Sequence, residues 1–500
     1  MVRSPFSTRL LVPMRLPALT VCLAAGLLAG CALQPPAQTS LPAAPAHWTH
    51  AGDPSPTVST PAGNGLSSRN EAWWEVLHDP AIDTLVTQAD RSAPTLGIAL
   101  ARIEQARATL DAAQATRRPQ LGASLSASRG TNTATFPISI ENVLSASLNA
   151  SWEVDLFGRL RHSAAAAQNR LDARLADAQL AKLSLDSQVA DTVLLLRACA
   201  LTTARQADTV LSSETTLRLT EIKRGAGLAA PPDVARSRTS VGEARSSRIS
   251  TESQCRQYSE TLADLVGSDS SSVMDVLSRS GPPDRTPLPT APDIALELPA
   301  TVLAAHPSLV SAQRAADAAF EDIGQARAGR LPSLNLAALL SSSRIQFGAF
   351  NQNVNGWSLN PSLSGTPYDG GSGAANVAGA RGRHAEALAN LQQTLRDTVR
   401  DVEIALIQGD SAGQGEHEAA LTVQAADDLF RASEAAQKAG RLNVFDLETA
   451  RSALLSAQTS LISAQRDRAR AWVALVKASG NTLAVPPSPD LKGPRPGVAP

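Results

Sequence analysis

Apolar residues recur along this chain at intervals that predict very long helices. Between about Arg159 and Arg224, small or apolar residues alternate at spacings of three and four, as in a coiled coil. They are Leu171, Leu175, Ala178, Leu185, Val189, Thr192 and Leu196. Proline is absent between Pro137 and Pro231, so nothing there forces the helix to end. At 1.5 Å per residue this helix would be roughly 100 Å long and would need packing partners along its length.

Glycine and proline mark where each long helix should turn back. Gly225 and Gly227, followed by Pro231 and Pro232, predict the end of one helix and the start of an antiparallel partner running to about Val266. A second hairpin is predicted over about 372–480, with its turn near Gly440 to Asn443.

Three glycines lie within the first helix of that second hairpin. They are Gly409, Gly413 and Gly415. Each costs about 1 kcal/mol relative to alanine in a helix. We therefore expect a break or bulge at this point.

Between the predicted helices the period of the pattern falls to two, which predicts strands over about 120–152 and 333–366. In the first segment the apolar positions are Leu121, Ala123, Leu125 and Ala127, then Leu144, Ala146, Leu148, Ala150 and Trp152. In the second they are Leu334, Leu336, Trp357, Leu359 and Leu363. Serine, glycine or asparagine stands between most of them.

One apolar and one small polar face suit a transmembrane barrel with a wet lumen, in which Trp152 and Trp357 are candidates for the interfacial girdle. A soluble sandwich with one solvated face would show the same alternation. Four strands are too few to close a barrel, so the membrane interpretation requires several chains to share one sheet.

The chain contains two copies of one plan. Residues 93–121 resemble residues 306–334 without a gap, at a period of about 213, and Pro94 and Pro119 match Pro307 and Pro332. Similarity returns at an offset two residues larger, where Lys223, Gly225, Asp233 and Ala235-Arg236 match Lys438, Gly440, Glu448 and Ala450-Arg451. Each copy is predicted to run helix, strand pair, helix, helix.

The expected divisions are a signal peptide at 1–30, an extended tether at 31–69, the first repeat at 70–266, a linker at 267–300, the second repeat at 301–480 and a flexible tail at 481–500.

The N-terminal segment has the order of a secretory signal. Arg3, Arg9 and Arg15 precede an apolar run of eleven residues, which is too short to span a bilayer as a helix. The run is followed by Leu28-Ala29-Gly30-Cys31, which resembles the lipobox of bacterial lipoproteins, so Cys31 is the expected lipidation site. The alternative is an ordinary signal peptide with an incidental cysteine. Ala32 follows the cysteine where an Asp would commonly retain a lipoprotein at the inner membrane, so the resemblance implies the Gram-negative outer membrane.

Composition and motifs argue against several other functions. A net charge of -1 offers no basic field for nucleic acid. The seven histidines show no metal-ligand spacing, and Gly370-Gly371-Ser372-Gly373 lacks the lysine of a phosphate loop. No catalytic arrangement of serine, cysteine and histidine stands out. We therefore expect no enzyme activity, no metal and no cofactor apart from a covalent lipid on Cys31.

Cys199 and Cys255 lie symmetrically about residue 227, the predicted turn of the first hairpin. In an antiparallel pair of helices they would lie at one level, about 40 Å from the tip by the helical rise. The periplasm is oxidising, so we predict a disulfide between them. Two buried free thiols are the alternative.

Several motifs together resemble the TolC-like outer membrane factor family, in particular its lipidated branch in tripartite efflux systems. They are Trp73-Trp74 with Asp79-Pro80, Arg118-Pro119, the run from Trp152 to Arg159 reading WEVDLFGR, Leu331-Pro332, the run from Pro367 to Gly371, and Val402-Glu403 with Ala405-Leu406. The WEVDLFGR run is the most specific, and the resemblance covers about residues 70–480.

The resemblance implies a mainly α fold with membrane β-structure: a homotrimer whose twelve strands, four per chain, form a β-barrel continued by a long α-helical barrel. It implies an outer membrane channel that passes small toxic molecules or drugs outward from an inner membrane pump, expected to be proton-driven, through a periplasmic adaptor. The same duct could serve type I protein secretion, and a lipid-anchored periplasmic coiled-coil scaffold without a pore is a third hypothesis.

The family's periplasmic tips contact the adaptor and form a gate of carboxylates and arginines. Here the candidates are Asp233, Arg236, Asp446, Glu448 and Arg451. Family members often carry an Asp and an Arg three residues apart on the inner tip helix, where an ungapped count from the turn places Thr449 and Ser452. Glu448 and Arg451 keep this spacing one position earlier, on one helical face.

Overall fold

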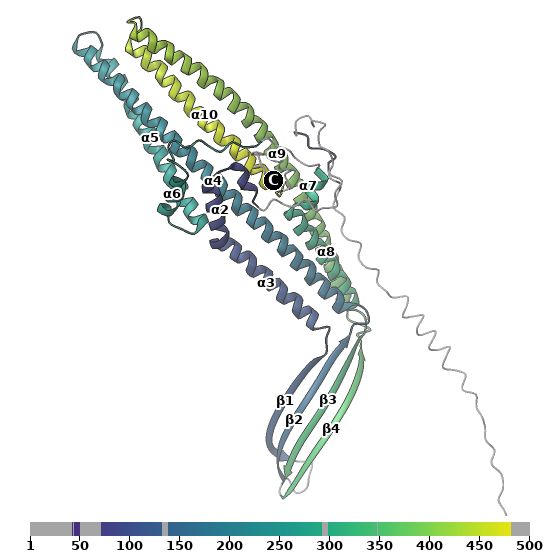
Figure 1. The fold of residues 1–500 in the computed structure, drawn as a ribbon. Helices are drawn as coiled ribbons and strands as arrows, with labels where there is room; N and C mark the ends of the chain where they lie inside the picture. Colours follow the sequence, from purple (N-terminus) through teal and green to yellow (C-terminus); the bar gives the residue numbers. More distant parts are fainter. Residues whose placement is uncertain are drawn as a thin grey trace, which may run out of the picture. The chain divides into compact units, whose positions relative to one another are not determined.

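The computed structural model describes residue 43 and residues 45–50, 72–132, 139–292, 299–347 and 349–481. The expected signal peptide, the lipidation site Cys31, most of the tether and almost all of the tail lie outside these residues. The elements are η1 (Trp73–Leu77), α2 (Pro80–Ser92), α3 (Pro94–Ala115), β1 (Gln120–Asn132), β2 (Ser139–Val154), α4 (Arg159–Gly225), α5 (Pro231–Val266), α6 (Ser270–Arg279), α7 (Pro299–Ala305), α8 (Pro307–Ala328), β3 (Ser333–Phe347), β4 (Phe350–Ser364), α9 (Ser372–Lys438) and α10 (Val444–Ala478) (Figure 1). The predicted order of helix, strand pair, helix, helix is present twice, and the predicted mainly helical chain with four strands is confirmed.

The two long helices are equal in length. Helices α4 and α9 each contain 67 residues, and their partners α5 and α10 contain 36 and 35. The starts of α3 and α8, of α4 and α9, and of α5 and α10 are each 213 residues apart. One constant offset therefore relates the two copies through their hairpins, and the larger offset inferred from the sequence is wrong at the tips.

Helix α9 runs without interruption through Gly409, Gly413 and Gly415, so the expected break is absent. A Cβ atom at Gly413 or Gly415 would meet nothing within 4 Å, which means that close packing does not require glycine there. The helical propensity cost of a glycine is local and about 1 kcal/mol, whereas a long helix is stabilised mainly by its tertiary contacts. One such contact is the ion pair from Arg468 of α10 to Glu416 of α9, at 2.8 Å.

The chain divides into two compact units, and each unit takes segments from both sequence repeats. The described parts of unit 1 lie within residues 106–171 and 315–388, and those of unit 2 lie within 40–105, 172–314 and 389–481. The expected repeat boundaries therefore do not separate compact bodies. The stretch expected to be a linker contributes to unit 2 as well, because α6 is capped by Asp269 and buries Val273 and Leu277.

Unit 1 contains one antiparallel sheet in the order β1-β2-β3-β4 (Figure 1). The central pair, β2 and β3, joins the first copy to the second, with Leu148 opposite Leu340. Strands β1 and β4 are each paired on one side only within the described chain. An edge strand of this length leaves a row of backbone donors and acceptors open to another strand.

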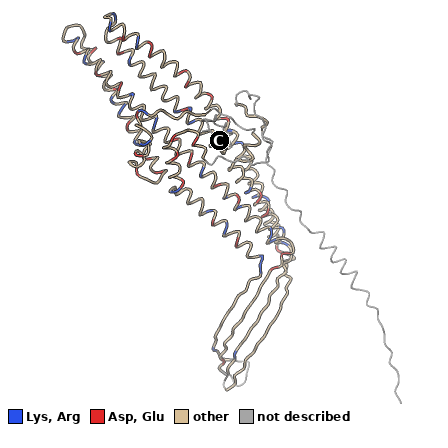
Figure 2. Tube along the Cα trace, viewed as in Figure 1, with Lys and Arg blue, Asp and Glu red and all other residues tan. Residues whose placement is uncertain are grey.

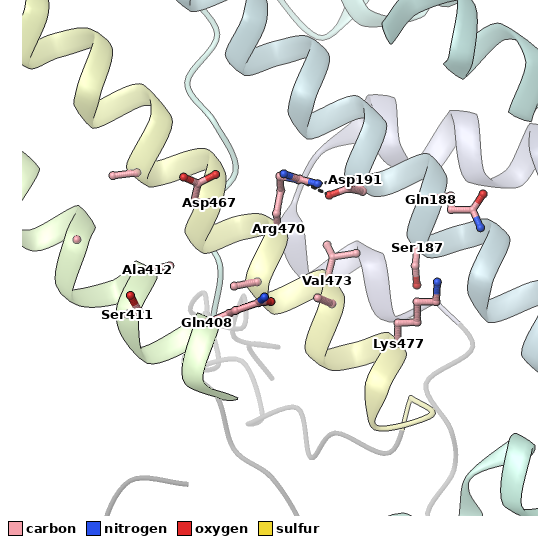
Figure 3. Close-up of a pocket in the computed structure, with 14 residues that line it drawn as sticks. Ser187, Gln188, Asp191, Gln408, Ser411, Ala412, Asp467, Arg470, Val473 and Lys477 are labelled. Carbon is pink, nitrogen blue, oxygen red and sulfur yellow. Dashed lines mark hydrogen bonds and ion pairs between the residues drawn. The ribbon is translucent and has the colours of Figure 1, made fainter. Parts of the chain in front are cut away.

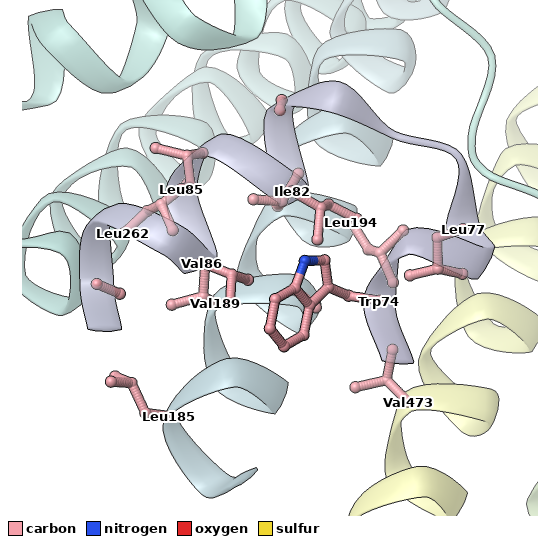
Figure 4. Close-up of a cluster of buried hydrophobic side chains, with 14 of the residues drawn as sticks. Trp74, Leu77, Ile82, Leu85, Val86, Leu185, Val189, Leu194, Leu262 and Val473 are labelled. Carbon is pink, nitrogen blue, oxygen red and sulfur yellow. The ribbon is translucent and has the colours of Figure 1, made fainter. Parts of the chain in front are cut away.

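Unit 2 has an apolar core built around the short N-terminal elements. Trp74 and Leu77 of η1, and Leu85 of α2, pack against α4, α5 and α10 (Figure 4). Trp73 packs at a tilt on Trp472 of α10, with ring centroids 5.7 Å apart. Asp79 caps α2 by accepting from Ala81 N at 2.9 Å. The Trp73-Trp74 and Asp79-Pro80 motifs thus fix where α2 begins and fill the centre of this unit.

Candidate functional site

The sheet of unit 1 has two chemically different faces, as its alternation predicted. One face, here called the apolar face, exposes large hydrophobic side chains on all four strands. They include Leu121, Leu125, Leu144, Leu148, Trp152, Leu340, Trp357, Leu359 and Leu363. Trp357 is 82% exposed, which is costly in water but favourable in a hydrocarbon layer.

The opposite face, here called the polar face, consists mainly of serine, glycine and asparagine. Ser124 and Ser147 hydroxyl oxygens lie 2.7 Å apart, and those of Ser145 and Ser343 lie 2.9 Å apart. A Cβ atom at Gly122 would lie 2.8 Å from Asn149 Oδ1, so glycine leaves room for that amide. Hydroxyls and amides bind water without imposing a charge, and this face can therefore line an aqueous path.

The two tryptophans proposed for an interfacial girdle do not share one register level of the sheet. Trp152 is paired with Leu336 at the helix end of β2, and its Nε1 donates to Arg117 O at 3.0 Å. Trp357 is paired with Leu340, four residues further along β3. Because barrel strands tilt, pairing register does not give membrane depth, and the place of both tryptophans in the interfacial girdle stays a prediction.

The WEVDLFGR motif forms the corner between β2 and α4. Arg159 Nη2 donates to Glu153 Oε2 at 2.6 Å across the corner. Asp155 accepts from the backbone N–H groups of Leu160 and Arg161, at 3.2 and 2.9 Å, and so caps α4. Gly158 has a φ of +83°, a conformation that favours glycine. The motif therefore joins a strand rigidly to a very long helix.

The second copy uses the same device at the start of α9. Asp369 accepts from Gly373 N at 2.6 Å and from Gly371 N at 2.9 Å. These two backbone hydrogen bonds, led by that of Gly373, lower the pKa of Asp369. The Pro367 to Gly371 motif is thus explained by helix capping.

At the first tip, between α4 and α5, Leu228 N donates to Lys223 O at 2.8 Å and Gly227 has a φ of +74°. Asp233 Oδ2 then accepts from Ala230 N at 3.1 Å, which caps α5. Arg236 is 80% exposed and its Nη2 lies 3.6 Å from Asp233 Oδ1. These two candidates lie together at the surface of the tip.

The second tip, between α9 and α10, is built in the same way. Gly440 has a φ of +68°, and Arg441 N donates to Ala436 O at 2.9 Å. Asn443 caps α10 by accepting from Asp446 N at 3.1 Å, and Asp446 Oδ2 accepts from Asn443 Nδ2 at 2.5 Å.

The backbone of the tips corrects the sequence alignment between the two copies. Gly440 corresponds to Gly227, because both have left-handed conformations, and not to Gly225, which is the last residue of α4. Asp446 therefore corresponds to Asp233. Glu448, which the sequence comparison matched to Asp233, stands two positions further along α10.

The structure separates Glu448 from the other tip candidates. Its side chain is 5% exposed, and Ser212 of α4 donates a hydrogen bond to its Oε2 at 2.5 Å. Arg451 Nη1 lies 3.1 Å from the other carboxylate oxygen, and its guanidinium carbon lies 5.5 Å from the Phe430 ring. Glu448 thus joins two hairpins within the chain and does not face solvent there.

The two tips also touch each other through a contact that the sequence did not suggest. Lys223 Nζ lies 3.9 Å from the centre of the Phe445 ring, a cation–π geometry. Lys223 had been noted for the repeat match alone and Phe445 not at all, and the packing of α4 against α10 brings them together. Thr449 and Ser452, which an ungapped count placed at the family's gate, are exposed on α10.

Cys199 of α4 and Cys255 of α5 form a disulfide in the structure, with Cα atoms 5.6 Å apart. Because the helices are antiparallel, residues equidistant from the turn lie at one level, as the sequence argument required. The bond would staple the first hairpin well away from its tip.

Two charged clusters in unit 2, one buried and one partly buried, were not predicted from the sequence. Arg197 of α4 donates from Nη2 to Asp79 Oδ1 at 2.7 Å, with both side chains at most 5% exposed. Lys182 contacts both Asp90 and Asp186, and the Asp186 side chain is 3% exposed. Charged residues on an amphipathic helix usually face solvent, so their type gave no indication that these side chains pack inside the unit. For the first cluster, the Asp79-Pro80 motif was the one sequence feature that pointed to a structural role for Asp79.

A short strap from the N-terminal region also packs on unit 2; we use this word for residues 48–50. Trp48 is 5% exposed and belongs to a cluster with residues of α7, α8, α9 and α10. Glu403 of α9 accepts from Thr49 N at 2.7 Å and from His50 N at 3.1 Å, and His50 Nδ1 lies 2.9 Å from the same carboxylate. Burial opposes ionisation of Glu403, but these hydrogen bonds outweigh it and lower its pKa. The Val402-Glu403 motif is explained by this contact.

A groove of about 650 Å³ lies between α4, α9 and α10 in unit 2 (Figure 3). Its walls carry Arg470, whose Nε donates to Asp191 Oδ1 at 2.6 Å, together with Lys477 and Gln408. Small residues such as Ala412 and Gly415 also line it. The arginine and aspartate neutralise each other.

Among the residues that the structure describes, no group of three or more metal-ligating side chains occurs. No helix in those residues combines the length and apolarity needed to cross a membrane.

The chain resembles known proteins along most of its length. It matches the family model described as "Outer membrane efflux protein" over residues 85–268 and 298–481. It is 27% identical over 464 residues to the pyoverdine export outer membrane protein OpmQ of Pseudomonas aeruginosa, covering 91% of this chain and 94% of that protein. It is 26% identical over 476 residues to the toluene efflux pump outer membrane protein TtgC of Pseudomonas putida, covering 92% and 95%. The solved structure of the outer-membrane channel OprN superposes with a TM-score of 0.76 at 24% identity, covering 89% of this chain and 98% of that one.

Proposed function

This chain belongs to the outer membrane efflux protein family, and on that premise we propose that three copies form one conduit across the outer membrane and the periplasm. The membership confirms the family resemblance suggested by the sequence motifs, and the assignment to its lipidated branch stays a prediction. In this proposal twelve strands close a β-barrel, the long helices continue it as a tunnel, and the protein transports and does not catalyse.

The open sheet of unit 1 carries this proposal. It exposes a row of large apolar side chains on one face and small hydrophilic ones on the other, and both edge strands have a free side within the described chain. Four strands cannot close on themselves, because the smallest membrane barrels have about eight. Pooling the edges of several sheets satisfies the backbone in hydrocarbon and turns the polar face toward water.

The cargo that we propose is a class of small toxic molecules or drugs. One relative is named for pyoverdine export and another for toluene efflux, which are small molecules of very different polarity. The polar face of the sheet carries serine and asparagine at most positions, and its carboxylates, Glu141 and Glu153, stand near the two ends of β2, so the middle of the face carries no charge.

The partners that we propose are a periplasmic adaptor and an inner membrane pump. The exposed turns at the two tips are the surface for the adaptor, with Asp233, Arg236 and Asp446 among the charged groups there. Glu448 and Arg451 act differently in this proposal: they hold α10 against α4, so that the position of one hairpin depends on the other.

Lipidation at Cys31 completes the proposal. An acyl chain there would fasten the start of the N-terminal tether to the membrane, and the strap, in the middle of that tether, packs on unit 2. Metabolic labelling with a palmitate analogue should label the wild type and leave a Cys31→Ser variant unlabelled.

The function is tested by two matched variants on neighbouring residues of β2. Leu148 lies on the apolar face and Ser147 on the polar face, so Leu148→Arg places a charge toward lipid and Ser147→Arg places it toward the lumen. A charge on the lipid face costs about 2 to 4 kcal/mol near the bilayer midplane, whereas a lumen charge changes selectivity.

In planar bilayers the purified wild type should give stepwise conductance, and its mass in detergent should equal three chains. Leu148→Arg should reduce insertion, and Ser147→Arg should insert normally but shift selectivity toward anions. A wild type without conductance, or one of single-chain mass, would contradict the proposal and favour a pore-free scaffold.

A further inference from the structure

Two arginines stand near the turn end of the apolar face, where most side chains are polar and Ile140 is the exposed hydrophobic residue beyond them. Arg129 of β1 is paired in register with Asn142 of β2, and Arg344 of β3 is paired with Leu144. Directly paired residues point to the same side of a sheet, and every second residue of a strand does so too. Both arginines therefore share the face of Leu144, and both are exposed.

Neither guanidinium has an acidic partner in the part of the chain that the structure describes. Arg129 has no hydrogen bond or ion pair with any residue that the structure describes, and Arg344 donates from Nε to the neutral Asn351 Oδ1 at 3.1 Å. Glu141, the acidic residue at this end of β2, stands one position from Asn142 and so belongs to the polar face. Figure 2 shows how few charges the strands carry and that positive ones lie near the turn end.

The two arginines border one hollow. A cavity of about 400 Å³ is lined by Arg129, Asn142, Arg344 and Gln346, together with Leu144 and neighbouring residues of β1 and β2. Strand spacing and rise place the two arginine Cα atoms about 12 Å apart, a gap that two long side chains can close on one ligand. The two amide side chains add neutral donors and acceptors beside them.

The position of the hollow indicates what kind of ligand it meets. The apolar stretch of β2 from Leu144 to Trp152 is about 27 Å long by the strand rise, similar to the apolar band of membrane barrels. Arginines at the end of such a band, or just beyond it, reach the headgroup layer, where their charge remains solvated. Guanidinium groups bind phosphate through paired, charge-assisted hydrogen bonds.

We propose that Arg129 and Arg344 bind the phosphate of a phosphorylated lipid headgroup in the outer leaflet of the outer membrane. The site rests on the proposed function, in which the sheet lies in the membrane and its turn end faces outward. The ligand is a lipid and not a free anion, because the hollow continues into the exposed apolar face, where acyl chains would lie against Leu144 and Leu148.

The experiment uses the purified full chain in detergent and three probes: bisphosphorylated lipid A, the same lipid with its phosphates removed, and inorganic phosphate. Binding of the lipids is measured by native mass spectrometry over a concentration series, at low and high salt. The variant is the double substitution R129Q/R344Q, which removes both charges and keeps a polar side chain at each position. The control is R381Q/R383Q, which removes two exposed arginines of α9 in the same unit.

We expect the bisphosphorylated lipid to bind the wild type at least tenfold more tightly than the dephosphorylated lipid does. R129Q/R344Q should lose most of this difference, the control should keep it, and high salt should weaken it because the attraction is ionic. The proposal is overturned if phosphate removal does not weaken binding, or if both double variants behave alike. It is also overturned if inorganic phosphate binds the same arginines equally well, since the ligand would then be a free anion.

Conductance in planar bilayers separates this result from the proposed function. R129Q/R344Q should still form channels of wild-type conductance, because the arginines lie outside the lumen. A conducting wild type with no preference for the phosphorylated lipid would overturn only the headgroup site. A wild type that fails to conduct would contradict the channel itself.

Discussion

Replacing Asp186 by Asn should remove a pH dependence of stability from the neutral range. The Asp186 side chain is 3% exposed, and its Oδ1 has no hydrogen-bond partner among the described residues. Its other oxygen lies 3.3 Å from Lys182 Nζ, and the same ammonium contacts Asp90. Burial, followed by the negative charge of Asp90, raises the pKa of Asp186 from 3.8 to about 7.

The direction of the effect follows from proton binding in the two states. Folded Asp186 keeps its proton at higher pH than unfolded Asp186 does. The stability is therefore complete below about pH 4 and falls as the pH rises toward 7. A difference of about three pH units corresponds to about 4 kcal/mol at most, because each unit is worth about 1.4 kcal/mol. Residual structure in the unfolded state reduces this figure, so we expect about 1 to 4 kcal/mol.

The assay is thermal unfolding of the purified protein in detergent from pH 4 to pH 8.5, followed by tryptophan fluorescence. Trp74 is a nearby reporter, since its ring centre lies 5.6 Å from Lys182 Nζ. Asp186→Asn should unfold several degrees above the wild type at pH 8 and close to it at pH 4. Asp90→Asn should shift the midpoint of the wild-type decline to lower pH, because it removes the second cause of the raised pKa.

The matched control is Asp208→Asn, on the same helix, where the carboxylate is 48% exposed and pairs with Arg205 at 3.2 Å. It should leave the pH profile unchanged. If the wild type and Asp186→Asn lose stability in parallel between pH 4 and pH 8, Asp186 does not titrate in this range and the reasoning fails.

Three further results are expected. Arg197→Met should lower the free energy of unfolding by about 3 to 5 kcal/mol, because it removes the cation that pairs with the buried Asp79 carboxylate. If the variant and the wild type were equally stable in chemical denaturation, the pair would be dispensable. Glu403→Gln should speed hydrogen exchange of the two backbone amides of the strap about tenfold, as it removes their charged acceptor, while Glu416→Gln on the same helix should not. Alkylation of denatured protein without reductant should leave Cys199 and Cys255 unmodified, and mass spectrometry showing both alkylated would mean that they are free thiols.

The secondary structure was predictable from the sequence because its causes are local. Spacings of three and four, with no proline between Pro137 and Pro231, were enough to predict α4 and α5, and period-two alternation predicted the four strands. The expected break in α9 was wrong because it was inferred from a local preference where tertiary contacts decide. Glycine propensity is also a local quantity, but a long helix depends on contacts with its neighbours, such as the pair from Arg468 to Glu416.

The candidate tip site was predicted only in part. Asp233, Arg236 and Asp446 lie at the turns, as the positions of glycine and proline indicated. Glu448 has a suitable charge and spacing but is buried against Ser212, a residue 236 positions away. Helical periodicity indicates that two residues share a face, but not which neighbour that face meets.

The order of residues alone determined where this chain forms helices, strands and turns, since these features depend on the pattern of apolar residues and on backbone preferences over a few positions. The tertiary structure decided which glycines occupy equivalent turns, which charges are buried, and which face of the sheet carries Arg129 and Arg344 beside the same hollow. Burial and electrostatic pairing arise between segments far apart in the chain, and no local pattern records the distance between two such segments once they pack.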